Sequence, residues 1–491
     1  MPKVMILSKN TKKQIEVPAG TLLHDALSLA GEEIFRPCGG RGVCGKCAVR
    51  ASGVLSPKTP SEEHLSDGMR LACTTKILGD AVIALGEQAA MAIETSHSFR
   101  ISRLSPMGQG FGAAVDIGTT TVILHLFDLS DGRCVGEAAQ ANPQGVIAAD
   151  VMGRIGAFPA EGERMRVLIT DCVSSLLSEC CEKAAVPSSS VSVFVLTGNT
   201  TMLYLLTGRD PACLGRAPFR ADTLFDTETE FLGRRAYLPP CMDAFVGADI
   251  TCAVLASGMC EKDETSLLCD LGTNGEIALW KNGTLSVTST AAGPAFEGAG
   301  ISSGCRSIPG AVDRVTPENG ILSAHTIGEL PPVGVCGSGL IDAIAAGLEL
   351  ELIDETGAAD DDLLLCAKGG NVSLIGRDIR AVQLAKAAVA AGIRALLHAS
   401  GTDFSEIGTL YLAGGFGSHL PIISSVRIGL LPAELADKVT VLGNAALAGT
   451  EELLLDSSLL TRAREIASHS RSVPLGGDPY FNEEYIEQMF F

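Results

Sequence analysis

The strongest constraint on the fold is a segment rich in glycine and cysteine. Residues 35–49, "FRPCGGRGVCGKCAV", hold Cys38, Cys44 and Cys47, and Cys73 follows in "MRLACTT". Four thiolates suit either a tetrahedral zinc ion or an iron–sulfur cluster. Structural zinc sites usually combine two short cysteine pairs, whereas this pattern is three plus one. We therefore expect these four cysteines to bind a [2Fe–2S] cluster, and zinc is the alternative.

The glycines of this loop support the cluster interpretation. A loop wrapped around an anionic cluster turns its N–H groups inward, needs positive φ angles and leaves no room for Cβ atoms. The loop contains Gly39, Gly40, Gly42 and Gly45. Its Cys-x5-Cys-x2-Cys spacing is one residue longer than the plant-type pattern, and it resembles the spacing of adrenodoxin-like ferredoxins.

Composition bounds the class of protein. A chain of 491 residues with 46% hydrophobic residues and 55 glycines indicates several α/β domains. No stretch of 18 residues is free of charged or turn residues, and "MPKVMILSKN" has too short an apolar core for a signal peptide. We expect no membrane span and a cytoplasmic location. In a reducing compartment most of the 16 cysteines are core thiols or metal ligands.

Charge is unevenly distributed along the chain. Residues 1–86 hold 11 basic and 8 acidic residues, a net charge of +3, although the whole chain carries −20. The acidic bulk argues against a nucleic-acid partner. The basic residues of the cysteine loop suit an acidic docking partner, and solvated charge without a partner explains them equally well.

The first 86 residues predict a small mixed sheet that holds one helix. Short apolar alternation predicts strands over 3–7, 13–17, 46–52 and 80–85. Residues 21–31, "TLLHDALSLAG", have apolar residues at helical spacing and end in glycine. The cysteine loop follows this helix directly.

A strand that ends in aspartate and a glycine turn follows residues 87–110. In "FGAAVDIGTTTVILHLFDL", strand 113–117 runs into a Gly-Thr-Thr turn and returns as strand 122–127. Asp116 at the strand end can hold Mg²⁺ or a water molecule. Gly118, Thr119 and Thr120 offer N–H and hydroxyl groups to phosphate oxygens.

The same pattern recurs 154 residues later. "SLLCDLGTNGEIALW" places Asp270 before Gly272, Thr273 and Asn274. Two such hairpins predict a duplicated fold whose halves face a shared cleft. A third glycine turn, "LYLAGGFGSHL", follows another strand and can pass beside a base or ribose.

These three elements resemble the phosphate-1, phosphate-2 and adenosine motifs of the acetate/sugar kinase, heat-shock chaperone and actin superfamily. Further stretches resemble the reductive activators of corrinoid-dependent methyltransferases, which join an N-terminal [2Fe–2S] ferredoxin domain to such an ATPase domain. The stretches are "NPQGVIAADVMGRI", "LTGNTTMLYLLTG", "FVGADI", "AGPAFEGAGI", "GVCGSGLIDAI", "IRAVQLAKAAVAAGI" and "LAGGFG".

The resemblance implies a fold and a domain order. We expect an α+β β-grasp ferredoxin domain, then an α/β two-lobed actin-like ATPase domain with duplicated ribonuclease-H-like lobes. The expected boundaries are 1–86 for the ferredoxin domain, 87–110 for a linker and 111–491 for the ATPase domain, with lobes at about 111–260 and 261–465 and a C-terminal extension at 466–491.

It also implies an activity. The chain is expected to be an ATP-hydrolysing iron–sulfur electron-transfer activase that returns inactive Co(II) to Co(I) in a corrinoid protein. Its cofactors would be a [2Fe–2S] cluster, ATP and Mg²⁺. Its partners would be the corrinoid (cobalamin-binding) protein of a methyltransferase system and an upstream low-potential reductant, with homodimerisation suggested and no nucleic acid or membrane involved.

The resemblance assigns roles to residues of the ATPase domain. Asp116 and Asp270 would place Mg²⁺ or the attacking water, and Asp249 in "FVGADI" would be the water-orienting base. An N-cap for a helix over 250–258 explains Asp249 equally well. Glu297 in "AFEGAG" is a weaker candidate, and accepting hydrogen bonds from backbone N–H groups explains it equally well. The residues expected to contact phosphates or the nucleoside are Gly118, Thr119, Thr120, Gly272, Thr273, Asn274, Gly414, Gly415 and Phe416.

Other functions stay open from the residues alone. A small-molecule kinase with a fused ferredoxin would share both halves, and so would an ATP-dependent electron activator of another low-potential enzyme. A non-enzymatic ferredoxin-type carrier would leave the glycine turns unexplained. Cys269 and Cys336 have apolar flanks and are expected to be buried core thiols.

Overall fold

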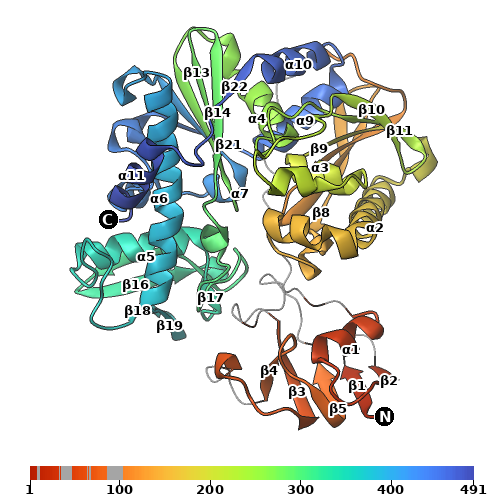
Figure 1. The fold of residues 1–491 in the computed structure, drawn as a ribbon, viewed down its shortest axis with the longest axis vertical. Coiled ribbons are helices and arrows are strands. Elements are labelled where there is room, and N and C mark those ends of the chain that lie inside the picture. The colour runs from red at the N-terminus through yellow and green to blue at the C-terminus, as the bar shows by residue number, and fades with distance from the viewer. Residues whose placement is uncertain are drawn as a thin grey trace. The chain divides into compact units, whose positions relative to one another are not determined.

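A computed structural model describes residues 1–7, 12–32, 34, 42, 47–62, 65, 68–85 and 103–491 of the chain. These residues belong to two compact units (Figure 1). One comprises Met1–Ala90 with Pro143–Ala157, and the other comprises Met91–Asn142 with Phe158–Phe491. None of the helices in the described ranges is both long enough and apolar enough to span a bilayer.

The N-terminal unit is built on a five-stranded mixed sheet in the order β2-β1-β5-β3-β4. β1 pairs antiparallel with β2 and parallel with β5, and β3 pairs antiparallel with both β5 and β4. Val4 and Ile6 of the sheet and Leu23 and Leu27 of the helix share one buried core. The predicted β-grasp ferredoxin fold is confirmed. Its elements are β1 (Lys3–Leu7), β2 (Lys12–Glu16), α1 (Leu23–Leu29), β3 (Ala48–Leu55), β4 (Met69–Leu71) and β5 (Ile77–Ala84).

The larger unit contains two six-stranded sheets with the same core topology. In each, three consecutive antiparallel strands are followed by strands that add in parallel to the first of the three. The orders are β10-β11-β9-β6-β7-β8 and β21-β20-β12-β13-β14-β22. The predicted duplication into ribonuclease-H-like lobes is therefore confirmed.

The first sheet consists of β6 (Phe111–Ile117), β7 (Thr121–Asp128), β8 (Arg133–Ala141), β9 (Val191–Gly198), β10 (Thr227–Phe231) and β11 (Arg234–Leu238). The second consists of β12 (Ser266–Leu271), β13 (Gly275–Lys281), β14 (Thr284–Thr290), β20 (Thr409–Ala413), β21 (Val439–Gly443) and β22 (Ser470–Ser472).

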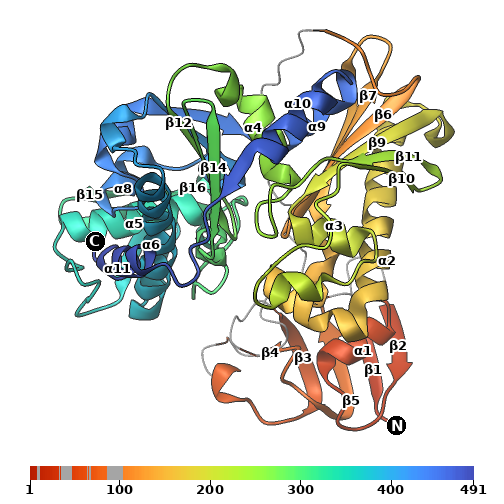
Figure 2. The ribbon, with the colours of Figure 1, turned by 45° about the horizontal axis from the view of Figure 1, so that its top comes forward.

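Three helices lie between the two large sheets. They are α4 (Ala248–Ser257), α9 (Ala445–Leu455) and α10 (Leu459–His469) (Figure 2). Ala114 of β6 and Leu268 of β12, one from each sheet, share a single apolar core with residues of these helices. The lobes are thus joined through packed helices as well as through the chain.

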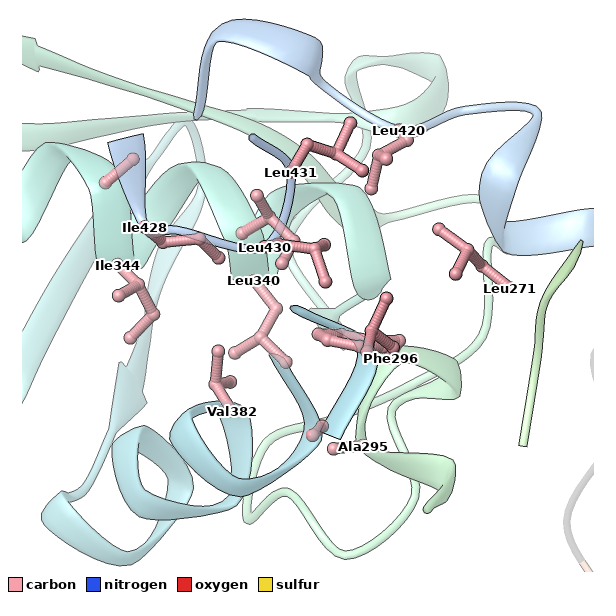
Figure 3. Close-up of a cluster of buried hydrophobic side chains, with 14 of the residues drawn as sticks. Leu271, Ala295, Phe296, Leu340, Ile344, Val382, Leu420, Ile428, Leu430 and Leu431 are labelled. Carbon is pink, nitrogen blue, oxygen red and sulfur yellow. The ribbon is translucent and has the colours of Figure 1, made fainter. Parts of the chain in front are cut away.

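The far face of the second sheet has its own core. Leu267 and Ile277 of the sheet pack with α5 (Gly337–Glu349) and α6 (Gly376–Ala399). Figure 3 shows Leu340 of α5 and Val382 of α6 converging with other apolar side chains of this core. A further five-stranded sheet comprises β15 (Ala311–Glu318), β16 (Ile321–Thr326), β17 (Gly334–Val335), β18 (Leu363–Ala367) and β19 (Gly370–Leu374).

The other helices are α2 (Val151–Ala184), α3 (Thr200–Leu206), α7 (Gly414–Gly417), α8 (Ile422–Arg427) and α11 (Pro479–Glu487). α11 packs on α6. Within the sequence expected to form a linker, Ser105 and Met107 donate backbone N–H bonds to Leu455 and Leu454 of α9. The proposed domain boundaries stay predictions.

Candidate functional site

Two of the four predicted cluster cysteines lie together in the N-terminal unit. Cys47 and Cys73 are 2% and 7% exposed, and their Sγ atoms are 3.2 Å apart. Cys38 and Cys44 lie outside the described residues. Two buried thiols that converge on one point suit a metal centre with thiolate ligands, so the described half of the set fits a [2Fe–2S] cluster. All four ligand roles remain predictions.

A buried carboxylate holds the segment that carries Cys73. Glu62 is fully buried and accepts hydrogen bonds from Arg70 Nε (3.0 Å), Leu71 N (2.9 Å) and Thr75 Oγ1 (2.8 Å). Burial opposes its charge, but the hydrogen bonds, with that of Arg70 foremost, lower the pKa of Glu62 to about 2. Because these donors flank position 73 on both sides, Glu62 fixes the backbone from which the Cys73 thiol projects.

The larger unit contains a cavity of about 400 Å³, a size typical of small-molecule sites. All twelve residues expected to hold nucleotide or catalyse hydrolysis line it. They are Asp116, Gly118, Thr119, Thr120, Asp249, Asp270, Gly272, Thr273, Asn274, Gly414, Gly415 and Phe416. The structure brings together residues from three distant parts of the chain, and their individual roles stay predictions.

Strand alternation explains why the aspartates converge. Side chains two apart in a strand share a face, so Asp116 lies on the face of Ala114 and Asp270 on the face of Leu268. Both faces turn toward α4 and α9. Asp249 lies in the first turn of α4 and completes the set.

The structure corrects one detail at Asp249. The alternative interpretation placed it as the N-cap of a helix over 250–258, but α4 starts at Ala248 and its N-cap is Gly247. Asp249 is already helical, and its Oδ1 accepts a hydrogen bond from Ile250 N at 2.9 Å. A simple N-cap therefore does not explain this carboxylate.

The carboxylates at the cavity repel one another. Burial, together with the charges of Asp270 and Asp116, raises the pKa of Asp249 to about 8. Burial and the charge of Asp116 raise the pKa of Asp270 to about 7. Burial, together with the charges of Asp249 and Asp270, also raises the pKa of Glu276 well above its ordinary value. A cluster of this kind attracts a divalent cation, which supplies the opposite charge.

The threonines of the two turns meet at one carboxylate. Thr120 Oγ1 of the first lobe donates to Glu297 Oε2 at 2.9 Å, and Thr273 Oγ1 of the second donates to Glu297 Oε1 at 2.7 Å. The weaker candidate Glu297 therefore bridges the lobes. Its carboxylate accepts hydrogen bonds from two side-chain hydroxyls and occupies the position expected for phosphate oxygens.

The third glycine turn approaches Asp270 closely. Gly414 has a φ of +84°, and a Cβ at this position would lie 2.4 Å from Asp270 Oδ1, so only glycine fits. Phe416 follows and stacks on Phe296, with ring centroids 4.8 Å apart and planes 2° from parallel. The turn thus presents backbone to the acidic cluster and an aromatic face to the cavity.

Two asparagines at the cavity escaped sequence analysis. Asn444 caps α9 and donates to Asp116 Oδ2 at 3.0 Å. Asn199 caps α3 and donates to Thr119 Oγ1 at 3.0 Å. Each follows a glycine between a strand and a helix, in "LTGNTT" and "VLGNAA". This shared Gly-Asn pair is a signal that sequence reasoning could have used. Glu276, Arg306 and His419 also line the cavity without having been predicted.

Comparison with known families divides the chain into three matched segments. Residues 7–78 match the "2Fe-2S iron-sulfur cluster binding domain". Residues 111–262 match the "RACo middle region". Residues 264–491 match the "C-terminal domain of RACo the ASKHA domain".

Individual proteins are also similar to long stretches of the chain. The chain is 32% identical over 419 residues to "Corrinoid activation enzyme RamQ" of Eubacterium limosum, which covers 78% of this chain and 70% of that protein. It is 31% identical over 252 residues to "[Co(II) methylated amine-specific corrinoid protein] reductase" of Methanosarcina barkeri, which covers 47% of this chain and 46% of that protein. A solved structure titled "Reductive activator for corrinoid,iron-sulfur protein" is similar at 27% identity with a TM-score of 0.72, covering 100% of this chain and 98% of that one.

Proposed function

The chain belongs to the family of reductive activators of corrinoid proteins, and we propose that it hydrolyses ATP as it returns a Co(II) corrinoid to Co(I). The carrying observation is the single cavity at which Asp116, Asp249 and Asp270 meet, from the two lobes and the helix α4 packed between them. The N-terminal unit, when loaded with a [2Fe–2S] cluster, supplies a one-electron donor. The corrinoid protein is the substrate, and an upstream low-potential reductant would restore the electron.

The proposed hydrolysis uses the three aspartates in different ways. Asp116 and Asp270, at the ends of equivalent strands, would hold Mg²⁺ directly or through water. Asp249, whose pKa is raised, would orient the attacking water and take its proton. Electrostatics support this cation site, because a bound divalent cation would offset the mutual repulsion of the neighbouring carboxylates. ATP and water would give ADP and phosphate.

Glu297 would exchange places with the nucleotide. Its carboxylate accepts from Thr120 and Thr273, the hydroxyls expected to contact phosphate. A phosphate chain offers stronger acceptors to the same donors and repels the Glu297 charge. ATP binding would therefore replace a protein bridge between the lobes by a nucleotide bridge.

ATP is needed because the electron transfer is unfavourable. Plant-type [2Fe–2S] centres have potentials near about −400 mV, and the cobalt couple implied by the family lies lower. In a one-electron step each ~59 mV changes the equilibrium constant tenfold. Nucleotide can shift this balance only by favouring one conformation of the activator–corrinoid complex. We propose that the two-lobed cavity provides this differential binding, and that the activator works as a homodimer.

The test follows cobalt and phosphate together. The full chain, loaded with its cluster, is mixed with a Co(II) corrinoid protein and titanium(III) citrate, with and without MgATP. Co(I) absorbance should develop with MgATP, and phosphate should be released without any added acceptor. Acceptor-dependent phosphate transfer would instead indicate a kinase.

A variant makes the test specific. Asp249→Asn should lower phosphate release by a factor of about 10²–10⁴ and should remove the ATP-dependent Co(I) signal, with iron content unchanged. Asp263→Asn is the matched control, because Asp263 is exposed and does not line the cavity. Equal Co(I) formation in the absence of nucleotide would overturn the proposal.

A further inference from the structure

Three potential metal ligands gather at the edge of the first large sheet, apart from the nucleotide cavity. His125 lies on β7, and Cys134 and Glu137 lie on the edge strand β8. One ligand atom from each lies within 4.8 Å of the others. Glu137 Oε1 is 3.8 Å from Cys134 Sγ, and Glu137 Oε2 is 4.0 Å from His125 Nε2.

A β-bulge creates this arrangement. Residues three apart in a regular strand point to opposite faces, so Cys134 and Glu137 would be separated. The pairing of β7 with β8 shifts register between Leu126 and Phe127, so that Cys134 opposes Phe127 and Glu137 opposes His125. Phe127 and His125 share a face, and the bulge therefore brings the thiol, the carboxylate and the imidazole together. Bulges commonly re-aim side chains in this way at functional sites.

A second carboxylate orients the imidazole. His125 is buried, and its Nδ1 lies 2.7 Å from Oε1 of Glu451, a buried residue of α9. Nδ1 donates to this carboxylate, which directs Nε2 toward Cys134 and Glu137. A histidine whose second nitrogen is bound to a carboxylate is the usual arrangement around metal-binding imidazoles.

We propose that His125 Nε2, Cys134 Sγ and a Glu137 carboxylate oxygen bind a zinc ion. Imidazole, thiolate and carboxylate are all zinc ligands, and three protein ligands leave a fourth position for water or an added ligand. The Glu137 side chain is 56% exposed and free to adjust to the short zinc distances. The ion would tie β7 to β8 and, through Glu451, to α9.

The surrounding charges define the competing interpretation. Glu451 and Glu137 flank His125, and Lys183 Nζ lies 2.7 Å from Glu179 and 3.1 Å from the Glu137 carbonyl oxygen. Without metal, the same groups would remain a polar cluster in which the imidazole lies between two carboxylates.

Zinc content and zinc geometry test the proposal. The full chain with its iron–sulfur cluster loaded is incubated with ZnSO₄, desalted, and analysed for zinc and iron. We expect one zinc per chain with unchanged iron. Extended X-ray absorption fine structure at the zinc edge should show one sulfur at about 2.3 Å and nitrogen or oxygen neighbours at about 2.0–2.2 Å.

Variants separate this site from the cysteine loop. Cys134→Ser and Glu137→Gln should each weaken zinc binding at least tenfold, whereas Cys366→Ser, a thiol of the second lobe, should not. Glu451→Gln should weaken it 10–100-fold if the carboxylate orients the ligand. A zinc shell of four sulfurs, or zinc binding that is the same in Cys134→Ser, would overturn the proposal, as would no bound zinc at all. None of these readouts depends on ATP hydrolysis.

Discussion

At the scale of single residues, Glu62 shows how one buried charge sets local stability. Its folded pKa of about 2 lies below the ordinary value of 4.5. A carboxyl group with a lowered pKa stabilises the fold fully above pH 4.5, and this stabilisation is lost as the pH falls toward 2. The difference corresponds to about 3 kcal/mol.

Glu62→Gln should therefore lower the free energy of unfolding of the N-terminal unit by ~3–5 kcal/mol at pH 7, because the buried Arg70 guanidinium loses its carboxylate partner and keeps only backbone acceptors. Urea unfolding followed by hydrogen exchange of peptides from β3 to β5 measures this. The difference in unfolding free energy between wild type and Glu62→Gln should narrow as the pH falls from 4.5 to 2. Glu16→Gln, on the exposed side of β2, is the control. A gap that stays constant with pH would show that the Glu62 charge is not responsible.

Glu297 offers a residue-scale test of the proposal that ATP phosphates replace its carboxylate as the acceptor from Thr120 and Thr273. Glu297→Gln removes the charge that competes with phosphate, so ATP should bind more tightly. Hydrogen bonds to charged groups contribute about 1.5–3 kcal/mol. The glutamine amide still accepts hydrogen bonds from the two threonines, so only part of this energy is gained by ATP. We expect a gain in ATP affinity of about five- to tenfold, measured by calorimetry. Glu261→Gln, an exposed substitution, should leave affinity unchanged. Weaker binding would instead indicate that Glu297 helps to hold the cation.

At the scale of elements, the helices α4 and α9 position two of the acidic residues. Asp249 lies in the first turn of α4, and the N-cap of α9, Asn444, bonds to Asp116. The helices touch at Gly449, where a Cβ would lie 2.0 Å from the carbonyl oxygen of Cys252. Their close crossing therefore depends on the absence of a side chain.

Gly449→Ala should force α4 and α9 apart. Overpacking costs ~1–3 kcal/mol, and ATP hydrolysis should fall with stability because both helices carry cavity residues. Thermal unfolding and phosphate release measure the two effects. Gly376→Ala is the matched control, because a Cβ at the start of α6 meets nothing within 4 Å. Full activity with normal stability in Gly449→Ala would contradict this account of the crossing.

Local patterns predicted some elements better than others. The strand–aspartate–glycine hairpins were recognisable because the buried strands are continuous apolar runs and the turns need glycine. β4 spans only three residues and is too short to show alternation, yet it carries Arg70 and precedes Cys73. α4 begins after Gly247, which has no capping side chain, and the sequence pattern therefore predicts its first residue two positions too late.

At the scale of the whole molecule, duplication made the fold and most of the cavity predictable. The repeat of one hairpin implies two similar sheets, and a shared cleft then brings their aspartates together. The contacts of Asn199, Asn444 and Glu297 could not be derived, because each joins segments far apart in the chain. Such pairings are set by parallel strand order and helix packing, which local sequence patterns do not encode.

The helices packed between the sheets limit how nucleotide can move the lobes. Residues of both sheets and of α4 and α9 form one continuous apolar core, and opening it wide would expose that surface to water. Rearrangement is therefore confined to small sliding steps of close-packed helices, a shear motion. A change at the phosphates would then be transmitted as an ångström-scale shift of α4 and α9, and this shift would alter the packing of both lobes together.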